Sequence, residues 1–264
     1  MTIEGLSFLT ERPRPALIGM IHVGALPGTP RASRSVRELI AAAVDEARML
    51  VDGGVNAILL ENMHDVPYLK TRVGPEIVAA LTAVCAAVRG CVSLPLGVQV
   101  LAGANRQALA VAHAAGCEFI RCEGFVFAHV ADEGLMPDAD AGRLLRYRRR
   151  IGAEAVAVVA DIKKKHSAHA ITADVDLKET ARAAEFFGAD GVVVTGIATG
   201  RPTDPHDVQC VTEAVDLPVA IGSGLTPEDL ARYWPIADLF IVGSFVKQDG
   251  VWSNPIDAGR LGAF

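Results

Sequence analysis

Short uninterrupted runs of apolar residues alternate along this chain with alanine-rich stretches of helical periodicity. The apolar runs predict strands at 16–23, 57–63, 95–100, 119–125, 155–162, 191–196, 218–224 and 237–245. Because most of these runs lack alternating polar residues, we expect the strands to be buried on both faces, as in a parallel sheet. Between the first two runs, apolar residues from Val36 to Val51 recur every three or four positions, which predicts an amphipathic helix.

The helix boundaries have their own residue signals. Ser35 with Glu38, and Asp176 with Glu179, have the spacing of capping boxes. Proline at a first helical position, where no backbone N–H is needed, is predicted at Pro75, Pro205, Pro227 and Pro255. Glycines that favour left-handed helix ends are Gly53, Gly116 and Gly188.

Eight strands that alternate with about eight helices favour a closed barrel over an open doubly wound sheet. A dinucleotide-binding fold needs GxGxxG after its first strand, and the segment HVGALPG does not supply it. No linker or low-complexity segment interrupts the pattern. We therefore predict an α/β protein with one domain over residues 1–264, a single (β/α)8 TIM barrel of the phosphate-binding type.

Composition narrows the function classes. The chain of 264 residues is 51% hydrophobic and 21% charged, which excludes general disorder, and its net charge of −6 provides no global positive field for nucleic acid. No apolar run approaches the roughly 20 residues of a spanning helix, and the N-terminus lacks the pattern of an export signal. The five cysteines form no CxxC pair and indicate reduced thiols. We expect a cytoplasmic homo-oligomer with neither a membrane nor a nucleic-acid partner.

Active residues of such barrels lie where the strands end. That rule selects polar residues at the ends of otherwise apolar runs: His22, Glu61, Asn62, Gln99, Arg121, Glu123, Asp161 and Lys163. Polar groups at these positions are costly unless they face a wet site. For each of them the alternative is a charged layer that merely closes the end of the barrel.

The last strands end in glycine and serine. Gly222, Ser223 and Gly224 follow the seventh strand, Gly243 and Ser244 follow the eighth, and Gly196 follows the sixth. Backbone N–H groups in such turns can surround a phosphate, since glycine allows close approach. They are the predicted phosphate-binding residues, and ordinary tight turns are the alternative.

The segment DIKKKHSAH at 161–169 contains the predicted catalytic pair. Strand alternation would direct Asp161 and Lys163 to one face, as a general base and an electrophile or Schiff-base lysine. Glu61, Glu123 and His22 are the candidates for the complementary acid.

Further contacts are expected around this pair. Asn62, Gln99, Arg121 and His166 are predicted substrate contacts, and Lys164 and Lys165 would attract an anion from the loop. No cofactor is required by this scheme, although Glu61, Glu123 and Asp161 could together hold Mg²⁺ without any local motif.

Four segments resemble one known family. LIGMIHVGALPGTP, DIKKKHSAH, GVVVTGIATGRPT and ADLFIVGSFVKQDG are together similar to the BtpA family, and the likeness runs over nearly the whole chain. The resemblance implies a barrel like those of phosphate-binding enzymes, and the family's name implies a role in photosystem I biogenesis. It implies no established set of catalytic residues.

Three functions remain open from the sequence. The first is an enzyme that acts on a small phosphorylated molecule by isomerase, lyase or aldol-type chemistry. The second is a non-catalytic assembly factor, which would need an exposed apolar patch rather than polar residues at every strand end. The third is a metal-dependent hydrolase. The composition of the strand ends favours the first.

Overall fold

Parallel strands close into a barrel, as the sequence predicts. The computed structural model describes residues 6–11, 15–196, 202–222 and 224–264. Within these residues the barrel has eight strands: β1 (Ala16–His22), β2 (Ala57–Glu61), β3 (Leu96–Gln99), β4 (Phe119–Cys122), β7 (Ala157–Ile162), β9 (Gly191–Thr195), β10 (Val219–Gly222) and β11 (Leu239–Val242). They neighbour one another in chain order, and β11 returns to pair with β1. The closed (β/α)8 architecture is therefore confirmed.

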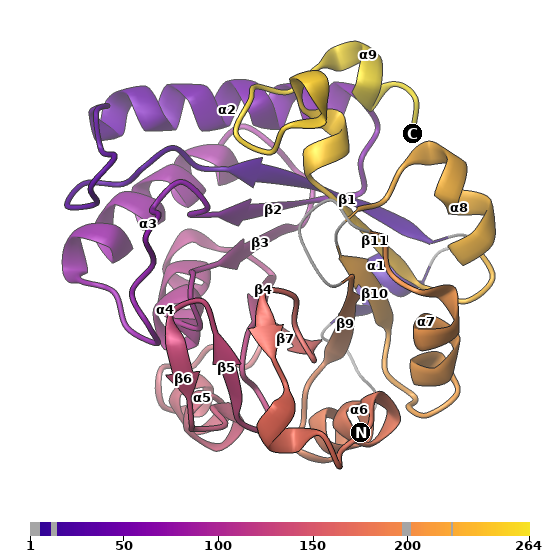
Figure 1. Cartoon of the computed structure of the whole chain (residues 1–264). Coiled ribbons are helices and arrows are strands. Elements are labelled where there is room, and N and C mark those ends of the chain that lie inside the picture. Colours follow the sequence, from indigo (N-terminus) through magenta and orange to yellow (C-terminus); the bar gives the residue numbers. More distant parts are fainter. Residues whose placement is uncertain (1–5, 12–14, 197–201, 223) are drawn as a thin grey trace.

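Helices surround the barrel (Figure 1). The helices that follow the strands are α2 (Val36–Asp52), α3 (Pro75–Arg89), α4 (Asn105–Ala115), α5 (Ala141–Arg150), α6 (Leu177–Phe186), α7 (Pro205–Thr212) and α8 (Pro227–Tyr233). After β11 come two 3₁₀ turns, η3 (Ser244–Val246) and η4 (Gln248–Gly250), and the short helix α9 (Ala258–Leu261).

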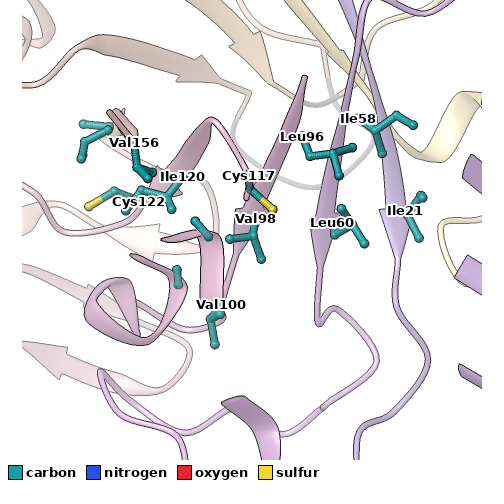
Figure 2. Close-up of a cluster of buried hydrophobic side chains, with 14 of the residues drawn as sticks. Ile21, Ile58, Leu60, Leu96, Val98, Val100, Cys117, Ile120, Cys122 and Val156 are labelled. Atoms are coloured by element: carbon teal, nitrogen blue, oxygen red, sulfur yellow. The ribbon is translucent and has the colours of Figure 1, made fainter. Parts of the chain in front are cut away.

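Two apolar cores lie on the two sides of the strands. Side chains directed outward from the strands, such as Ile58, Leu60 and Val98, pack against the helices (Figure 2). Side chains directed inward, such as Ile18, Leu59 and Val159, fill the barrel itself. The strands are thus buried on both faces, which explains why their sequences are apolar without alternation.

A short N-terminal helix closes one end of the barrel. Just before α1 (Ser7–Thr10), the side chain of Leu6 is fully buried in the interior core. The position of a Cβ at Gly191, the first residue of β9, would be 2.8 Å from Leu6 Cδ1, and the ring of Phe8 lies 6.5 Å from that of Phe119. Since Gly191 and Phe119 begin their strands, these contacts cover the barrel interior at the start of the strands.

Three short strands form an insertion that the sequence pattern does not reveal. β5 (His129–Ala131) and β6 (Gly134–Met136) form a hairpin after β4, and β8 (Ser167–Ala168) pairs with β5 from the loop after β7. The region 119–125 was expected to be one strand, but β4 ends at Cys122. Strands of two or three residues are too short to show periodicity, which is why they escaped prediction.

Most of the predicted helix boundaries are confirmed. Ser35 and Glu38 form a complete capping box, and Asp176 accepts a hydrogen bond from the N–H of Glu179. Gly116 and Gly188 have φ of +71° and +85°, as left-handed helix ends require.

Two boundary predictions are wrong. Gly53 ends α2 with a right-handed φ of −77°. Pro255 does not begin a helix: α9 begins at Ala258, where the side chain of Asp257 accepts the hydrogen bond from the N–H of Arg260. The side-chain cap on Asp257 therefore sets this helix start, three residues after the proline.

Gly97 provides the space for an aromatic ring inside the barrel. A Cβ at this position would lie 2.2 Å from Phe119 Cε2. We expect Gly97→Ala to lower the free energy of unfolding by about 1–3 kcal/mol, because overpacking forces the ring and the backbone to move. Urea denaturation measures this change in the free energy of unfolding.

The matched control is Gly90→Ala. Gly90 ends α3 with φ of −69°, and the nearest atom to its Cβ position is 3.5 Å away. This variant should stay within about 0.5 kcal/mol of the wild type. Equal stability of the two variants would contradict the packing described here.

Candidate active site

A layer of polar side chains faces inward at the carboxyl end of the barrel. His22, Glu61, Gln99, Arg121 and Asp161 come from the ends of five strands, β1, β2, β3, β4 and β7. All five are buried, and the strand register pairs His22 with Glu61 and Glu61 with Gln99. These residues were predicted as polar residues at the ends of apolar runs, and they share a direction because every second residue of a strand points into the barrel.

Arg121 and Asp161 form a buried two-pronged ion pair. Arg121 Nε donates to Asp161 Oδ1 at 2.8 Å, and Nη2 donates to Oδ2 at 3.1 Å. Burial opposes the charge on Arg121, but its contact with Asp161 outweighs burial and raises the pKa of the guanidinium. Gly222 makes room for the pair, since a Cβ there would lie 3.3 Å from Arg121 Nη2.

His22 is held as a neutral ring. Burial, followed by the charge of Lys247, lowers the pKa of His22 to about 3. Its Nδ1 lies 2.8 Å from the carbonyl oxygen of Trp252, which can only accept, so Nδ1 carries the proton. The lone pair of Nε2 then faces Glu61, whose Oε2 is 3.9 Å away. Burial raises the pKa of Glu61, while Arg121 is the largest influence that lowers it.

A cavity of about 340 Å³ opens above this layer. Glu61, Gln99, Arg121 and Asp161 line its floor, and residues of the β5–β6 insertion, including Glu133, line its side. We call it the mouth cavity. Gln99 Oε1 is buried there without a hydrogen-bond partner in the described part of the chain. A polar atom left in this state is costly and marks a place where a ligand can add a partner.

Lys165 reaches the mouth cavity from the loop after β7. Its backbone N–H donates to Thr195 Oγ1 at 3.0 Å, which fixes the loop against the end of β9. Burial, and then the charge of Arg121, lowers the pKa of Lys165. The sequence interpretation placed this lysine in an anion-attracting loop and did not include it among the site residues.

Lys163 lies elsewhere. It was expected to share a face with Asp161, but β7 ends at Ile162 and Lys163 has φ of +44°, which breaks the strand alternation. Its Nζ donates to the carbonyl oxygen of Thr172 at 3.3 Å. The alternation rule holds only while the backbone stays extended.

Glu123 pairs with a different lysine. Its Oε1 accepts from Lys164 Nζ at 3.0 Å, both side chains are buried, and Glu123 Oε2 has no hydrogen-bond partner among the described residues. His166 is exposed, with Nδ1 3.7 Å from Asp132 Oδ2, and lines the rim of the mouth cavity.

Asn62 supports the loops. Its Oδ1 accepts from the N–H of Leu101 at 2.7 Å, and its Nδ2 donates to Asp65 Oδ2 at 2.8 Å. With both ends of its amide engaged, Asn62 connects the loop after β2 to the loop after β3. This role differs from the predicted contact with substrate.

The described glycine and serine residues that follow the last three strands lie in three different places. Gly224, Gly243 and Ser244 line a small cavity of about 40 Å³ beside Arg121 and Lys165. Gly222 packs against Arg121, as described above. Gly196 lines a neighbouring cavity of about 310 Å³ on the other side of the loop after β7, and Ser223 lies outside the described residues.

Two of the three carboxylates considered for Mg²⁺ already accept hydrogen bonds from cationic side chains. Arg121 contacts Asp161, and Lys164 contacts Glu123. In the residues that the structure describes, no group of three or more His, Cys, Asp or Glu side chains has the arrangement of a metal site. A magnesium ion at Glu61, Glu123 and Asp161 would have to compete with these two cations.

The chain matches one known protein family over nearly its whole length. A model of the BtpA family matches residues 13–264. The chain belongs to the BtpA family. A relative in Synechocystis, the photosystem I biogenesis protein BtpA, is 34% identical, with 98% of this chain and 88% of that protein covered. An uncharacterized mitochondrial protein of Caenorhabditis elegans is 45% identical, with 98% and 95% covered.

Solved structures of low sequence identity share the barrel of this BtpA-family chain. Thiamine phosphate pyrophosphorylase from Pyrococcus furiosus aligns with a TM-score of 0.55 at 13% identity, covering 94% of this chain and 91% of that one. KGPDC from Streptococcus mutans aligns with a TM-score of 0.57 at 12% identity, covering 95% of each chain. At these identities the likeness concerns the fold. No described helix has the length and hydrophobicity needed to cross a membrane.

The neutral state of His22 makes stability depend on pH. Because its folded pKa lies near 3 and its unfolded pKa near 6.5, only the unfolded chain gains this proton as the pH falls between those values. Stability is then lost at about 1.4 kcal/mol per pH unit. We expect His22→Asn, measured by urea denaturation, to remove about 2 kcal/mol of the wild-type loss between pH 6.5 and 5.

The control is His113→Asn. His113 is exposed on α4 and should leave the pH dependence as in the wild type. Because each variant differs from the wild type at one histidine, the comparison isolates the effect of removing His22, including its effect on the nearby Glu61. Parallel curves for the wild type and His22→Asn would show that His22 is not held neutral.

Proposed function

We propose that this chain is an enzyme that acts on a small phosphorylated metabolite at the mouth of its barrel, by isomerase, lyase or aldol-type chemistry. One observation carries the proposal: a buried polar layer, with the unpartnered Gln99 Oε1, faces a cavity of about 340 Å³ at the carboxyl end of the strands. Active sites of TIM-barrel enzymes lie at this end. A layer that only closed the barrel would leave no such cavity.

Phosphate would bind beside the ends of β10 and β11. Gly224, Gly243 and Ser244 meet Arg121 and Lys165 around one small cavity. Backbone N–H groups, a hydroxyl and two cationic side chains are donors that suit a phosphate dianion. The structural neighbour from Pyrococcus furiosus is named for a phosphate ester, thiamine phosphate, which is consistent with this use of the fold.

The contacts favour Glu61 as the acid–base group and Lys165 as its cationic partner. Burial raises the pKa of Glu61 and lowers the pKa of Lys165, so both move toward neutral pH. Glu61 as a carboxylate would take a proton from a carbon beside a carbonyl group, and the Lys165 ammonium would stabilise the resulting enolate oxygen.

The roles predicted for Asp161 and Lys163 stay predictions. Asp161 has both carboxylate oxygens engaged by Arg121. Lys163 contacts the carbonyl oxygen of Thr172 instead of the mouth cavity. Asp161 would then serve by holding the guanidinium in place.

An assembly factor is the second candidate. The name of the Synechocystis relative supports it, and one observation in this chain favours it: Phe186 and Phe187, at the end of α6, are 86% and 52% exposed. Adjacent exposed aromatic side chains are typical of interaction surfaces. These two side chains would equally suit the interface of the homo-oligomer that is expected from composition. Sedimentation tests the oligomeric state. A cytoplasmic location remains a prediction, because the relative in Caenorhabditis elegans is named as a mitochondrial protein.

A thermal-shift panel of sugar phosphates and nucleoside phosphates tests the proposed function. A ligand at one hundred times its Kd stabilises the folded state by about 2.7 kcal/mol, so at least one compound should raise the Tm by several degrees. Ser244→Ala should weaken that response. No response to any compound in the panel would contradict a phosphorylated substrate.

With the substrate in hand, Glu61→Gln and Lys165→Met test the chemistry. Each should lower kcat about a hundredfold or more, because each removes a group that acts in the transition state. Lys178→Met, on the outer helix α6, is the control and should keep wild-type kcat. If Glu61→Gln turned over substrate at the wild-type rate, the acid–base role would pass to another group.

A further inference from the structure

A second cavity, of about 270 Å³, lies beside the end of β1. It is lined by the loop between β1 and α2, by α2 itself, by His64 and by the C-terminal segment at 253–255. We call it the β1–α2 cavity. Leu39 and Ala43 of α2 form an apolar wall, whereas Arg31, Arg34 and Asn254 contribute polar groups.

Aromatic and histidine rings separate this cavity from the mouth cavity. The ring of Trp252 lies 4.9 Å from that of His64 and 6.0 Å from that of His22. His22 and His64 line the β1–α2 cavity, and Trp252 lines the mouth cavity. The two cavities therefore share a wall and are separate spaces.

The charge balance of the β1–α2 cavity is positive. The one carboxylate in its lining, Glu46, is already matched, because Lys247 Nζ donates to Glu46 Oε2 at 2.7 Å and Lys247 is itself 1% exposed. In the described residues neither Arg31 nor Arg34 has a carboxylate within ion-pair distance. Both guanidinium groups are exposed at the cavity, and the carboxylate that feels the charge of Arg34, Glu38, is not ion-paired with it.

The positive potential extends to a neighbouring ring. Burial lowers the pKa of His64, and the charges of Lys247, Arg34 and Arg31 lower it further. Cations that disfavour protonation of a buried ring also favour an anion beside it. The whole chain has a net charge of −6, so a cluster of positively charged groups at one cavity differs from the overall charge of the protein.

We propose that the β1–α2 cavity binds a small organic anion, with its charged group between Arg31 and Arg34 and its less polar body against Leu39 and Ala43. Guanidinium groups hold phosphate and carboxylate by paired hydrogen bonds, so both oxyanions fit. The apolar wall favours an ion with a carbon body over a bare inorganic ion. His22 lines both this cavity and the small cavity of the phosphate position proposed at β10 and β11, whereas Arg31 and Arg34 line only the first of these two.

NMR titration with three probes tests the proposal: glycerol 3-phosphate, glycerate and inorganic phosphate. The ring signals of His64 are the reporter. In the wild type we expect an organic probe to shift these signals and to bind more tightly than inorganic phosphate. The first two probes tell whether phosphate or carboxylate is preferred.

The variant Arg31→Ala/Arg34→Ala should raise the Kd measured from the His64 signals about tenfold or more, since it removes two charge-assisted contacts. Arg37→Ala/Arg48→Ala changes the net charge equally on exposed residues of α2 and should bind as the wild type does. Equal affinity in the two double variants would overturn the proposal, as would His64 signals that no probe shifts.

A second arm separates this site from the phosphate position proposed at β10 and β11. Ser244→Ala should leave the His64 response intact, because Ser244 lines the small cavity at β11 and not the β1–α2 cavity. If Ser244→Ala abolished the response, the probes would bind at the small cavity only, and the proposal would be wrong. Weaker binding at the small cavity together with an unchanged His64 response would support a separate β1–α2 site.

Discussion

The buried ion pair of Arg121 and Asp161 constrains the packing and the protonation of the residues around it. Two charges inside a closed barrel lose their water, and their attraction compensates only when the geometry is close and the hydrogen bonds are complete. The geometry is close, with contacts of 2.8 and 3.1 Å that engage both carboxylate oxygens of Asp161. Gly222 on the neighbouring wall leaves space for the pair, since a Cβ there would lie 3.3 Å from Arg121 Nη2. The strands supply this geometry, because each residue occupies a fixed step of a rigid barrel.

The same pair influences the protonation of its neighbours. The charge of Arg121 lowers the pKa of Lys165 and opposes the burial that raises the pKa of Glu61. An acid and a base whose pKa values approach one another can exchange protons with a substrate near neutral pH. The chemistry proposed for the mouth cavity thus depends on a residue that need not itself react.

The barrel was predictable because strands buried on both faces leave long apolar runs in the sequence, and helix starts leave capping residues such as Ser35. The inward-facing residues at the strand ends were predictable for a related reason: alternation fixes their direction. The rule fails one residue beyond β7, where the left-handed φ of Lys163 turns the chain and makes Lys165 the lysine of the mouth cavity. Nothing local in the sequence places Trp252 beside His22, because that contact joins the two ends of the chain.

Whether the polar layer exists for binding or for stability is tested most directly by Arg121→Met/Asp161→Leu. Replacing a buried ion pair by apolar side chains of similar volume often leaves stability unchanged or raises it. We predict that the double variant unfolds at the same or a higher urea concentration than the wild type and no longer gains Tm with the phosphorylated ligands that stabilise the wild type. A variant that loses several kcal/mol of stability and still responds to those ligands would show that the pair is a structural support.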